Sequence, residues 1–313
     1  MKNQLTKADS PKKITVIGFG LMGAQISQVI SLAGYRVLAY DVDSKRLQSG
    51  LSLIRSGKYG LENSVRNNRI SKESAENALS KISTSESLED VLSGADFILE
   101  AVVEDLDTKR GIFLKASQIA SKEAVLASNT STISITKIAA VLDPASKKRL
   151  VGMHFFNPPQ IMKLVEIVRT EDTGVEIIEK VREVAVELGK TPVTVLDYPG
   201  FVANRIGISV FMEASDILSK GIASVRDIDI SMRLGYGYPM GPFELGDLVG
   251  LDSRLRNMEA LYDETKEERF KPPELLRKLV SEGYLGDRGS KTESKGGYYE
   301  YFGLERPSKE IGK

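Results

Sequence analysis

Hydrophobic and polar positions follow a strand–helix rhythm through the first two thirds of the chain. Ile14-Thr15-Val16-Ile17 is a short β-branched run, typical of a buried parallel strand. Residues 24–33 carry apolar side chains at helical spacing and end before Gly34, and residues 36–40 predict a second strand. Residues 44–82 then predict helices interrupted at Gly50, Gly57 and Gly60, an excursion from the alternating pattern.

The alternation resumes at residue 95. Strands are predicted at 95–99, 124–127, through His154, at 164–168 and at 192–196, with helices at 106–120 and 175–188. Asp197-Tyr198-Pro199-Gly200 is turn-forming, and the strand pattern stops there. We therefore predict an α/β fold with a Rossmann-type doubly wound sheet domain over residues 1–198.

The remaining residues, 199–313, predict helices without strands. The expected helices span residues 201–218, 225–234, 242–249, 252–268 and 273–282. The first is long and largely apolar, so other elements must cover it on several sides. We predict a smaller, all-helical domain that contributes to substrate binding and forms a homodimer.

A glycine motif joins the first predicted strand to the first helix. Gly18 permits a tight turn, Gly20 lets the backbone approach a pyrophosphate, and Gly23 lets helix and strand pack closely. The free amides that begin the helix, around Leu21 and Met22, favour phosphate. This context indicates a dinucleotide site; the alternative is a glycine-rich turn without a ligand.

An acid at the end of the second strand identifies the expected dinucleotide. Asp41 lies 18 residues after Gly23, where a carboxylate can bind the adenosine ribose hydroxyls. It would repel a 2′-phosphate, which favours NAD over NADP. Ser131, in the hydroxyl-rich segment after the strand at 124–127, is expected beside the nicotinamide, although such segments are more often simple turns.

Composition excludes several classes of protein. Lysine and arginine balance aspartate and glutamate at 43 each, so nothing favours a nucleic-acid partner. The chain has no cysteine, which excludes thiol nucleophiles, cysteine metal sites and a disulfide-stapled secreted fold; no metal is predicted. The first residues are polar, unlike a signal peptide, and no apolar run is long enough to span a membrane. We expect a cytoplasmic protein.

His154 is the only histidine in 313 residues. Imidazole is the side chain whose ordinary pKa suits proton transfer near neutral pH. Glu166, twelve residues later, interrupts an apolar run and needs a partner, which a nearby imidazole would provide. A lone histidine is also often a satisfied structural residue, and both interpretations stay open on these residues alone.

Six segments together resemble the L-3-hydroxyacyl-CoA dehydrogenases, and most closely their bacterial 3-hydroxybutyryl-CoA members. The likeness runs from about residue 13 to residue 301. The segments occur in the order typical of that family: IGFGLMG at 17–23, ASNTS at 127–131, HFFNP at 154–158, MKLVE at 162–166, PGFVANR at 199–205 and GYPMGP at 237–242.

The resemblance implies an NAD-dependent oxidation of an acyl-CoA in fatty acid metabolism, including β-oxidation, and it implies roles for matching residues. His154 would be the general acid/base and Glu166 its partner, while Ser131 and Asn204 would bind the reacting oxygen. Glu104, Lys109 and Asn157 match positions near the cofactor or active site.

Two segments depart from the family pattern. In an ungapped comparison, Gly60 and Asn67 stand where a serine and a lysine that contact CoA are expected. Lys58, Arg66 or Arg69 would be the substitutes, with solvated surface charge the alternative. The glycine-rich stretch 286–297 is longer than usual and has no explanation. Two other functions therefore stay open: a gulonate-type dehydrogenase of a small hydroxy acid without CoA, and a non-catalytic NAD-binding protein.

Overall fold

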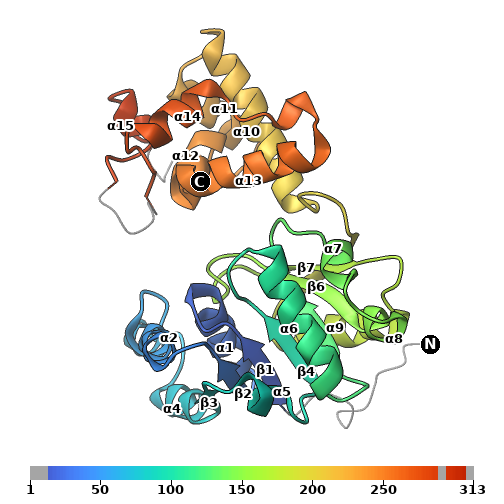
Figure 1. The fold of residues 1–313 in the computed structure, drawn as a ribbon. Helices are drawn as coiled ribbons and strands as arrows, with labels where there is room; N and C mark the ends of the chain where they lie inside the picture. Colours follow the sequence, from blue (N-terminus) through green and yellow to red (C-terminus); the bar gives the residue numbers. More distant parts are fainter. Residues whose placement is uncertain (1–12, 288–293, 308–313) are drawn as a thin grey trace, which may run out of the picture. The chain divides into compact units, whose positions relative to one another are not determined.

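The computed structural model describes residues 13–287 and 294–307, which form two compact units (Figure 1). The units are Met1–Tyr198 and Pro199–Lys313. The expected lead-in at residues 1–12 and the middle of the unexplained 286–297 stretch lie outside the described residues. Within the described ranges, no helix is long and apolar enough to cross a membrane.

The first unit alternates strands and helices. Its strands are β1 Lys13–Ile17, β2 Arg36–Tyr40, β3 Ile82–Ser85, β4 Phe97–Glu100, β5 Val125–Ser128, β6 Leu150–Phe155, β7 Leu164–Arg169 and β8 Thr191–Leu196. Its helices are α1 Leu21–Leu32, α2 Ser44–Ser56, α3 Leu61–Arg66, α4 Lys72–Ser80, α5 Leu88–Leu92, α6 Leu106–Ile119, α7 Ile135–Ala139, α8 Pro144–Lys148 and α9 Val175–Glu187. Helices pack on both faces of the sheet (Figure 1).

The strands form one sheet in the order β3-β2-β1-β4-β5-β6-β7-β8. The pairs from β3 to β6 are parallel, β7 runs antiparallel to β6, and β8 is parallel to β7. The Rossmann-type prediction is confirmed, with an antiparallel step that the hydrophobic pattern does not reveal. Because of that step, the residue opposite His154 on the neighbouring strand is Glu166.

Strand side chains that share one face of the sheet pack with α1 and α9. Val16 of β1, Met153 of β6 and Ile167 of β7 join Ile26 of α1 and Val181 of α9 in one buried apolar cluster. This burial, at roughly 25 cal/mol per Å² of apolar surface, holds the central strands and hence their carboxyl ends in place.

Two predictions for residues 44–82 are wrong. Gly50 does not interrupt a helix: it lies inside α2, where an added Cβ would meet the Phe19 ring at 2.3 Å, so it permits close packing. The region also ends in a strand, β3, which pairs with β2 at the sheet edge. By contrast, Gly57 ends α2 and Gly60 precedes α3, as predicted.

In its described residues, the second unit contains helices joined by loops and no strand. Its elements are α10 Ala203–Ser219, α11 Val225–Tyr236, α12 Pro242–Val249, α13 Leu251–Thr265, the 3₁₀ helix η1 Glu268–Phe270, α14 Glu274–Ser281 and α15 Tyr298–Tyr301. Phe211, Phe243 and Tyr298 meet in its core, where their ring centroids lie 4.6–5.9 Å apart.

Two helix ends in this unit differ from the pattern because of backbone conformation. The first helix begins at Ala203 rather than 201, because Gly200 and Phe201 have φ of 76° and 48°. The helix predicted to reach 268 ends at Thr265, because Lys266 adopts φ 54°.

Candidate active site

His154 and Glu166 form the buried centre of the candidate site. Antiparallel pairing of β6 with β7 sets the two residues opposite each other, and His154 Nδ1 lies 2.9 Å from Glu166 Oε2. Both side chains are at most 4% exposed. The ring of Phe156 packs beside the imidazole at 4.6 Å between centroids. The carboxylate accepts from Nδ1–H, which leaves Nε2 able to accept a proton.

Ser131 occupies the other side of the imidazole. Its Oγ lies 3.1 Å from His154 Nε2, and it follows β5 in the loop Asn129–Thr132. The structure therefore brings together three residues from three segments: the loop after β5, strand β6 and strand β7. Their order, serine, imidazole and carboxylate, is the arrangement in which a base is both oriented and aimed at a hydroxyl.

Glu104 holds the loop that carries Ser131. Its Oε1 accepts hydrogen bonds from the backbone N–H of Ser131 and of Thr132, both 2.9 Å long, and from Thr130 Oγ1 at 2.6 Å. Burial raises the pKa of the Glu104 carboxyl, but the charge of Lys109 and these hydrogen bonds outweigh it and lower the pKa below its usual range. Glu104 is thus an anion that fixes the serine loop.

Glu104 also takes part in an ion-pair network with Lys109 and Glu100. Lys109 Nζ lies 2.7 Å from Glu100 Oε1 and 3.3 Å from Glu104 Oε2. Glu100 also accepts from Ser128 Oγ at 2.7 Å. The side chains of Lys109 and Glu100 are at most 1% exposed, so removing Lys109 would leave the buried carboxylate of Glu100 without its counter-ion. Lys109 therefore joins α6 to the carboxyl ends of β4 and β5.

The glycine loop has the local geometry that a dinucleotide needs. Gly18 adopts φ 91°, and an added Cβ at Gly23 would lie 1.8 Å from Gly18 O, so both positions require glycine. Gly20 is the N-cap of α1 and has nothing within 4 Å of its Cβ position, which leaves open space before the helix. Leu21 and Met22 form the first turn of α1. These residues fit a pyrophosphate at the helix N-terminus.

Asp41 lies at the end of β2, beside the glycine loop. It is buried, and its carboxylate accepts from the N–H of Phe19 and of Val42, each at 2.8 Å. Arg46 Nε lies 3.9 Å away on a largely exposed side chain. A carboxylate oriented in this way is suited to accept ribose hydroxyl hydrogen bonds.

The structure places the two predicted asparagines separately. Asn157 is exposed in the segment that follows β6, three residues after His154. Asn204 is the second residue of α10, in the other unit. Its part in the site therefore rests on the family resemblance. Among the described residues, no cluster of three or more histidine, aspartate or glutamate side chains could hold a metal ion.

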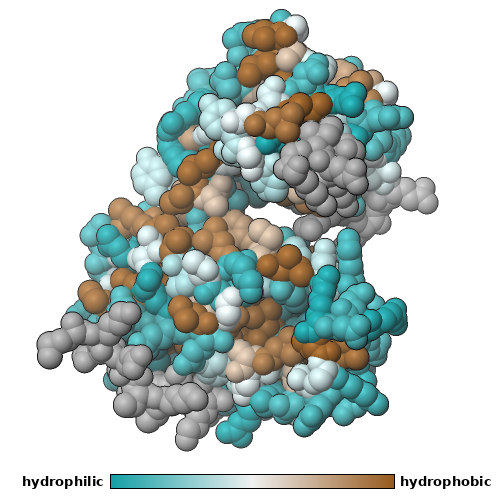
Figure 2. Space-filling view, turned by 180° about the vertical axis from the view of Figure 1, so that it is seen from behind, coloured by the Kyte–Doolittle hydropathy of each residue, from teal (hydrophilic) through white to brown (hydrophobic). Residues whose placement is uncertain are grey.

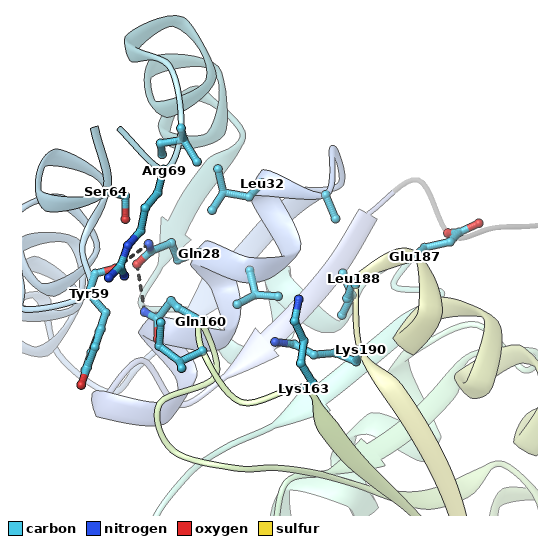
Figure 3. A pocket seen from close by; sticks show the side chains of 15 residues that line it. Gln28, Leu32, Tyr59, Ser64, Arg69, Gln160, Lys163, Glu187, Leu188 and Lys190 are labelled. Atoms are coloured by element: carbon cyan, nitrogen blue, oxygen red, sulfur yellow. Dashed lines mark hydrogen bonds between the residues drawn. The ribbon is translucent and has the colours of Figure 1, made fainter. Parts of the chain in front are cut away.

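A surface pocket lies beside the segment after β6, between α1, α3 and the start of β8. In Figure 3, Gln28 of α1 reaches Gln160, with Gln160 Nε2 donating to Gln28 Oε1 at 3.1 Å. Gln28 also donates to Tyr59 O at 2.9 Å. Lys163 and Lys190 extend into the pocket in the same view. The segment that carries Asn157 is therefore tied to the helical excursion.

Lys190 anchors the same segment from inside. Its Nζ donates to Pro159 O and, at 3.0 Å, to Met162 O, and the side chain is buried. Burial, with a smaller contribution from the charge of Lys163, lowers the pKa of Lys190 to about 8. Because the unfolded chain holds this proton up to a higher pH, the contribution of Lys190 to stability should rise between pH 8 and pH 10.

We expect the stability difference between wild type and Lys190→Met to grow over that range. The increase should be about 1–2 kcal/mol, since each unit of pKa difference corresponds to about 1.4 kcal/mol. Urea unfolding of both proteins at pH 7.5 and pH 10 measures it. In Lys163→Met, where the charge that repels Lys190 is absent, the increase in stability between pH 7.5 and pH 10 should be smaller than in wild type. If wild type and Lys190→Met differed in stability by the same amount at both pH values, the pKa of Lys190 would not be lowered in the folded protein.

Sequence patterns missed the residues that hold the site in shape. The sequence pattern assigned no role to Glu100 or Lys190, and Asp197 was assigned only to a turn. Only Glu100 had a usable signal, an acid that ends a buried apolar strand. Lys190 and Asp197 stand in ordinary turn sequences.

Comparison with known proteins gives a consistent result over both units. The family model described as 3-hydroxyacyl-CoA dehydrogenase, NAD binding domain, matches residues 13–198, and that of the C-terminal domain matches residues 200–301. A 3-hydroxybutyryl-CoA dehydrogenase of Bradyrhizobium diazoefficiens is 38% identical, over 94% of this chain and 97% of that protein.

Two further proteins extend the comparison. The mitochondrial hydroxyacyl-coenzyme A dehydrogenase of Homo sapiens is 37% identical, over 93% of this chain and 91% of that protein. The crystal structure of (S)-3-hydroxybutyryl-CoA dehydrogenase from Ralstonia eutropha has a TM-score of 0.82 at 37% identity, covering 89% of this chain and 96% of that one.

Proposed function

Because this chain belongs to the 3-hydroxyacyl-CoA dehydrogenase family, and is thus an NAD-dependent oxidoreductase, we propose that its substrate is a short-chain (S)-3-hydroxyacyl-CoA, foremost 3-hydroxybutyryl-CoA. The enzyme converts the C3 hydroxyl to a ketone and catalyses the reverse reduction. The names of the Bradyrhizobium and Ralstonia relatives support the short chain. The mitochondrial relatives, at similar identity, carry names that state no chain length.

The alignment of Ser131, His154 and Glu166 carries the proposal. A base whose Nδ1 is bonded to a buried carboxylate, and whose Nε2 is 3.1 Å from a hydroxyl, is ready to take a proton from an alcohol. In oxidation, His154 Nε2 removes the proton of the substrate hydroxyl. Glu166 orients the imidazole and stabilises the imidazolium that forms. When bound, NAD supplies the acceptor for the hydride that leaves C3.

We assign the cofactor contacts to residues that the fold brings to one edge of the sheet. Gly18, Gly20, Leu21, Met22 and Gly23 would hold the pyrophosphate, as their geometry fits it. Asp41 would bind the adenosine ribose. Glu104, Lys109, Ser131 and Asn157 are further cofactor-binding candidates through the family resemblance.

Two side chains are proposed to stabilise the oxygen where charge develops. Ser131 Oγ lies at hydrogen-bonding distance from the base, so a substrate oxygen bound there is shared between the two groups. Asn204 would donate to the same oxygen from the first turn of α10.

The CoA portion is proposed to contact basic side chains near α3. Lys58 precedes α3, Arg66 is the last residue of α3, and Arg69 lines the pocket in Figure 3. These cations suit the phosphates of CoA. Gly60 is the N-cap of α3 and Asn67 its C-cap, so both have structural roles where the family pattern suggested CoA contacts.

We further propose a homodimer that forms through the helical unit. Apolar side chains of this unit stay exposed, among them Ile206 at 58%, Leu234 at 57% and Tyr236 at 77%. The unit that is uppermost in Figure 2 shows brown, apolar groups on the face in view. Exposed apolar groups of this kind favour association. A cytoplasmic location is also proposed and fits the cysteine-free composition.

One assay separates the proposed activity from its alternatives. NADH oxidation is followed with acetoacetyl-CoA, longer 3-oxoacyl-CoA esters, free acetoacetate and a keto acid without CoA, with NADPH in parallel. We expect acetoacetyl-CoA with NADH to give the highest kcat/KM. Preference for the free keto acid would indicate a gulonate-type enzyme, faster turnover of long esters would overturn the chain length, and no turnover would indicate a non-catalytic NAD-binding protein.

A further inference from the structure

We propose that Asp197 is a positioning residue for Ser131, because it joins the segment that follows the Ser131 loop to the end of β8. Its Oδ2 accepts from Ser134 Oγ at 2.7 Å and from Thr136 N at 2.8 Å, and its Oδ1 from Ile135 N at 3.1 Å. One carboxylate thus binds the start of α7 through three donors, 61–63 residues away in sequence.

Asp197 is itself held by the sheet. It directly follows β8, and its N–H donates to Arg169 O at 2.8 Å, which continues the β7–β8 ladder by one residue. The backbone of Asp197 is therefore fixed by the sheet while its side chain fixes α7. The first unit ends one residue later, at Tyr198.

The serine loop consequently has two carboxylate anchors. Glu104 binds the N–H groups of Ser131 and Thr132 at one end, and Asp197 binds Ser134 and the two residues after it at the other. Only two residues, Thr132 and Ile133, separate Ser131 from Ser134. Loss of the second anchor would let Ser131 move relative to His154, and shifts of about 1 Å are known to cost up to about 100-fold in rate.

This inference rests on the proposed function, in which Ser131 binds the reacting oxygen beside His154. The chain provides a matched control in Asp143, a carboxylate that binds the N–H groups of Ala145 and Ser146, and Ser146 Oγ, at the start of α8. Asp143 is the N-cap of α8, whereas Asp197 binds the first N–H groups of α7, whose N-cap is Ser134; both helices have five residues. Asp143 precedes the amino end of β6, whereas His154 lies near its carboxyl end.

The test compares Asp197→Asn with Asp143→Asn in the full-length enzyme. The asparagine variants keep size but lose the charge and one acceptor. We expect Asp197→Asn to lower kcat about 10-fold or more, with KM for NADH and NADH affinity by fluorescence within about 2-fold of wild type. Asp143→Asn should change kcat less than about 2-fold at a similar loss of Tm. Equal kcat values for the two variants would overturn the proposal.

A double-mutant cycle supplies a readout that a purely structural role would not move. If Asp197 acts by positioning Ser131 against His154, the effect of Asp197→Asn should shrink to less than about 3-fold in a Ser131→Ala background. Full multiplication of the two effects would refute the linkage. Should Asp197→Asn not fold, Ser134→Ala removes a single hydrogen bond and should show the same coupling on a smaller scale. Asn204→Ala and His154→Ala with wild-type kcat would instead overturn the proposed function.

Discussion

Replacement of His154 by alanine is expected to lower kcat by about 10²–10⁴-fold, the usual contribution of a positioned general acid/base. The sequence contains no second histidine that could substitute for it. Its Nε2 is also the ring atom that faces Ser131 Oγ, at 3.1 Å. The loss should appear in kcat and in kcat/KM alike, because the proton moves only as the transition state forms. Steady-state reduction of acetoacetyl-CoA measures both constants.

The control for His154→Ala is cofactor binding. NADH affinity, measured by fluorescence titration, should stay within about 3-fold of wild type, because the imidazole lies among β6 and β7 rather than in the glycine loop. Truncation also leaves the buried carboxylate of Glu166 without its imidazole partner, so Tm should fall as well. A folded variant that turns over at near wild-type rate would refute the assignment.

Glu166→Gln is expected to have the second largest effect, a loss of kcat of about 10²–10⁴-fold. A glutamine can present its N–H₂ to His154 Nδ1, which would place the imidazole proton on Nε2 instead. Nε2 then has no lone pair with which to accept the substrate proton. The shape of the site and its packing between β6 and β7 would be preserved. Turnover should therefore suffer far more than NADH affinity.

The single histidine makes this prediction directly observable. After selective ¹⁵N labelling of histidine in tag-free protein, one imidazole contributes the signals, and their shifts distinguish the Nδ1–H from the Nε2–H tautomer. We expect Nδ1–H in wild type and a shift toward Nε2–H in Glu166→Gln. An unchanged tautomer, or NADH affinity reduced more than kcat, would mean that Glu166 has a structural role only.

Local pattern predicted the features of the fold that depend on residues near one another in sequence. The strand Lys13–Ile17, the glycine turn and α1 were recognisable because each needs a particular spacing of apolar and glycine residues. The boundary of the helical α10 was less accurate, because positive φ at Phe201 is a backbone choice that the residue type does not favour. β3 was missed because it is a four-residue edge strand without buried side chains.

The pairing of His154 with Glu166 was only partly predictable from the sequence. An acid within an apolar run required a partner, and only one imidazole existed, so the pair could be suggested from the residues. That the two face each other depends on β7 running antiparallel to β6. Nothing in the hydrophobic pattern distinguishes that direction from a parallel return.

Sequence patterns alone were enough to predict the class of this protein: a dinucleotide-binding α/β unit, a helical unit, and a family whose site residues it retains. This was possible because apolar periodicity and glycine spacing are properties of consecutive residues. How the site is held depends on the tertiary structure. Glu104 binds N–H groups of the Ser131 loop 27–28 residues away in sequence, and Asp197 binds the start of α7 61–63 residues away. Such contacts arise from the order and direction of strands in the sheet, which place distant carboxylates at the same edge.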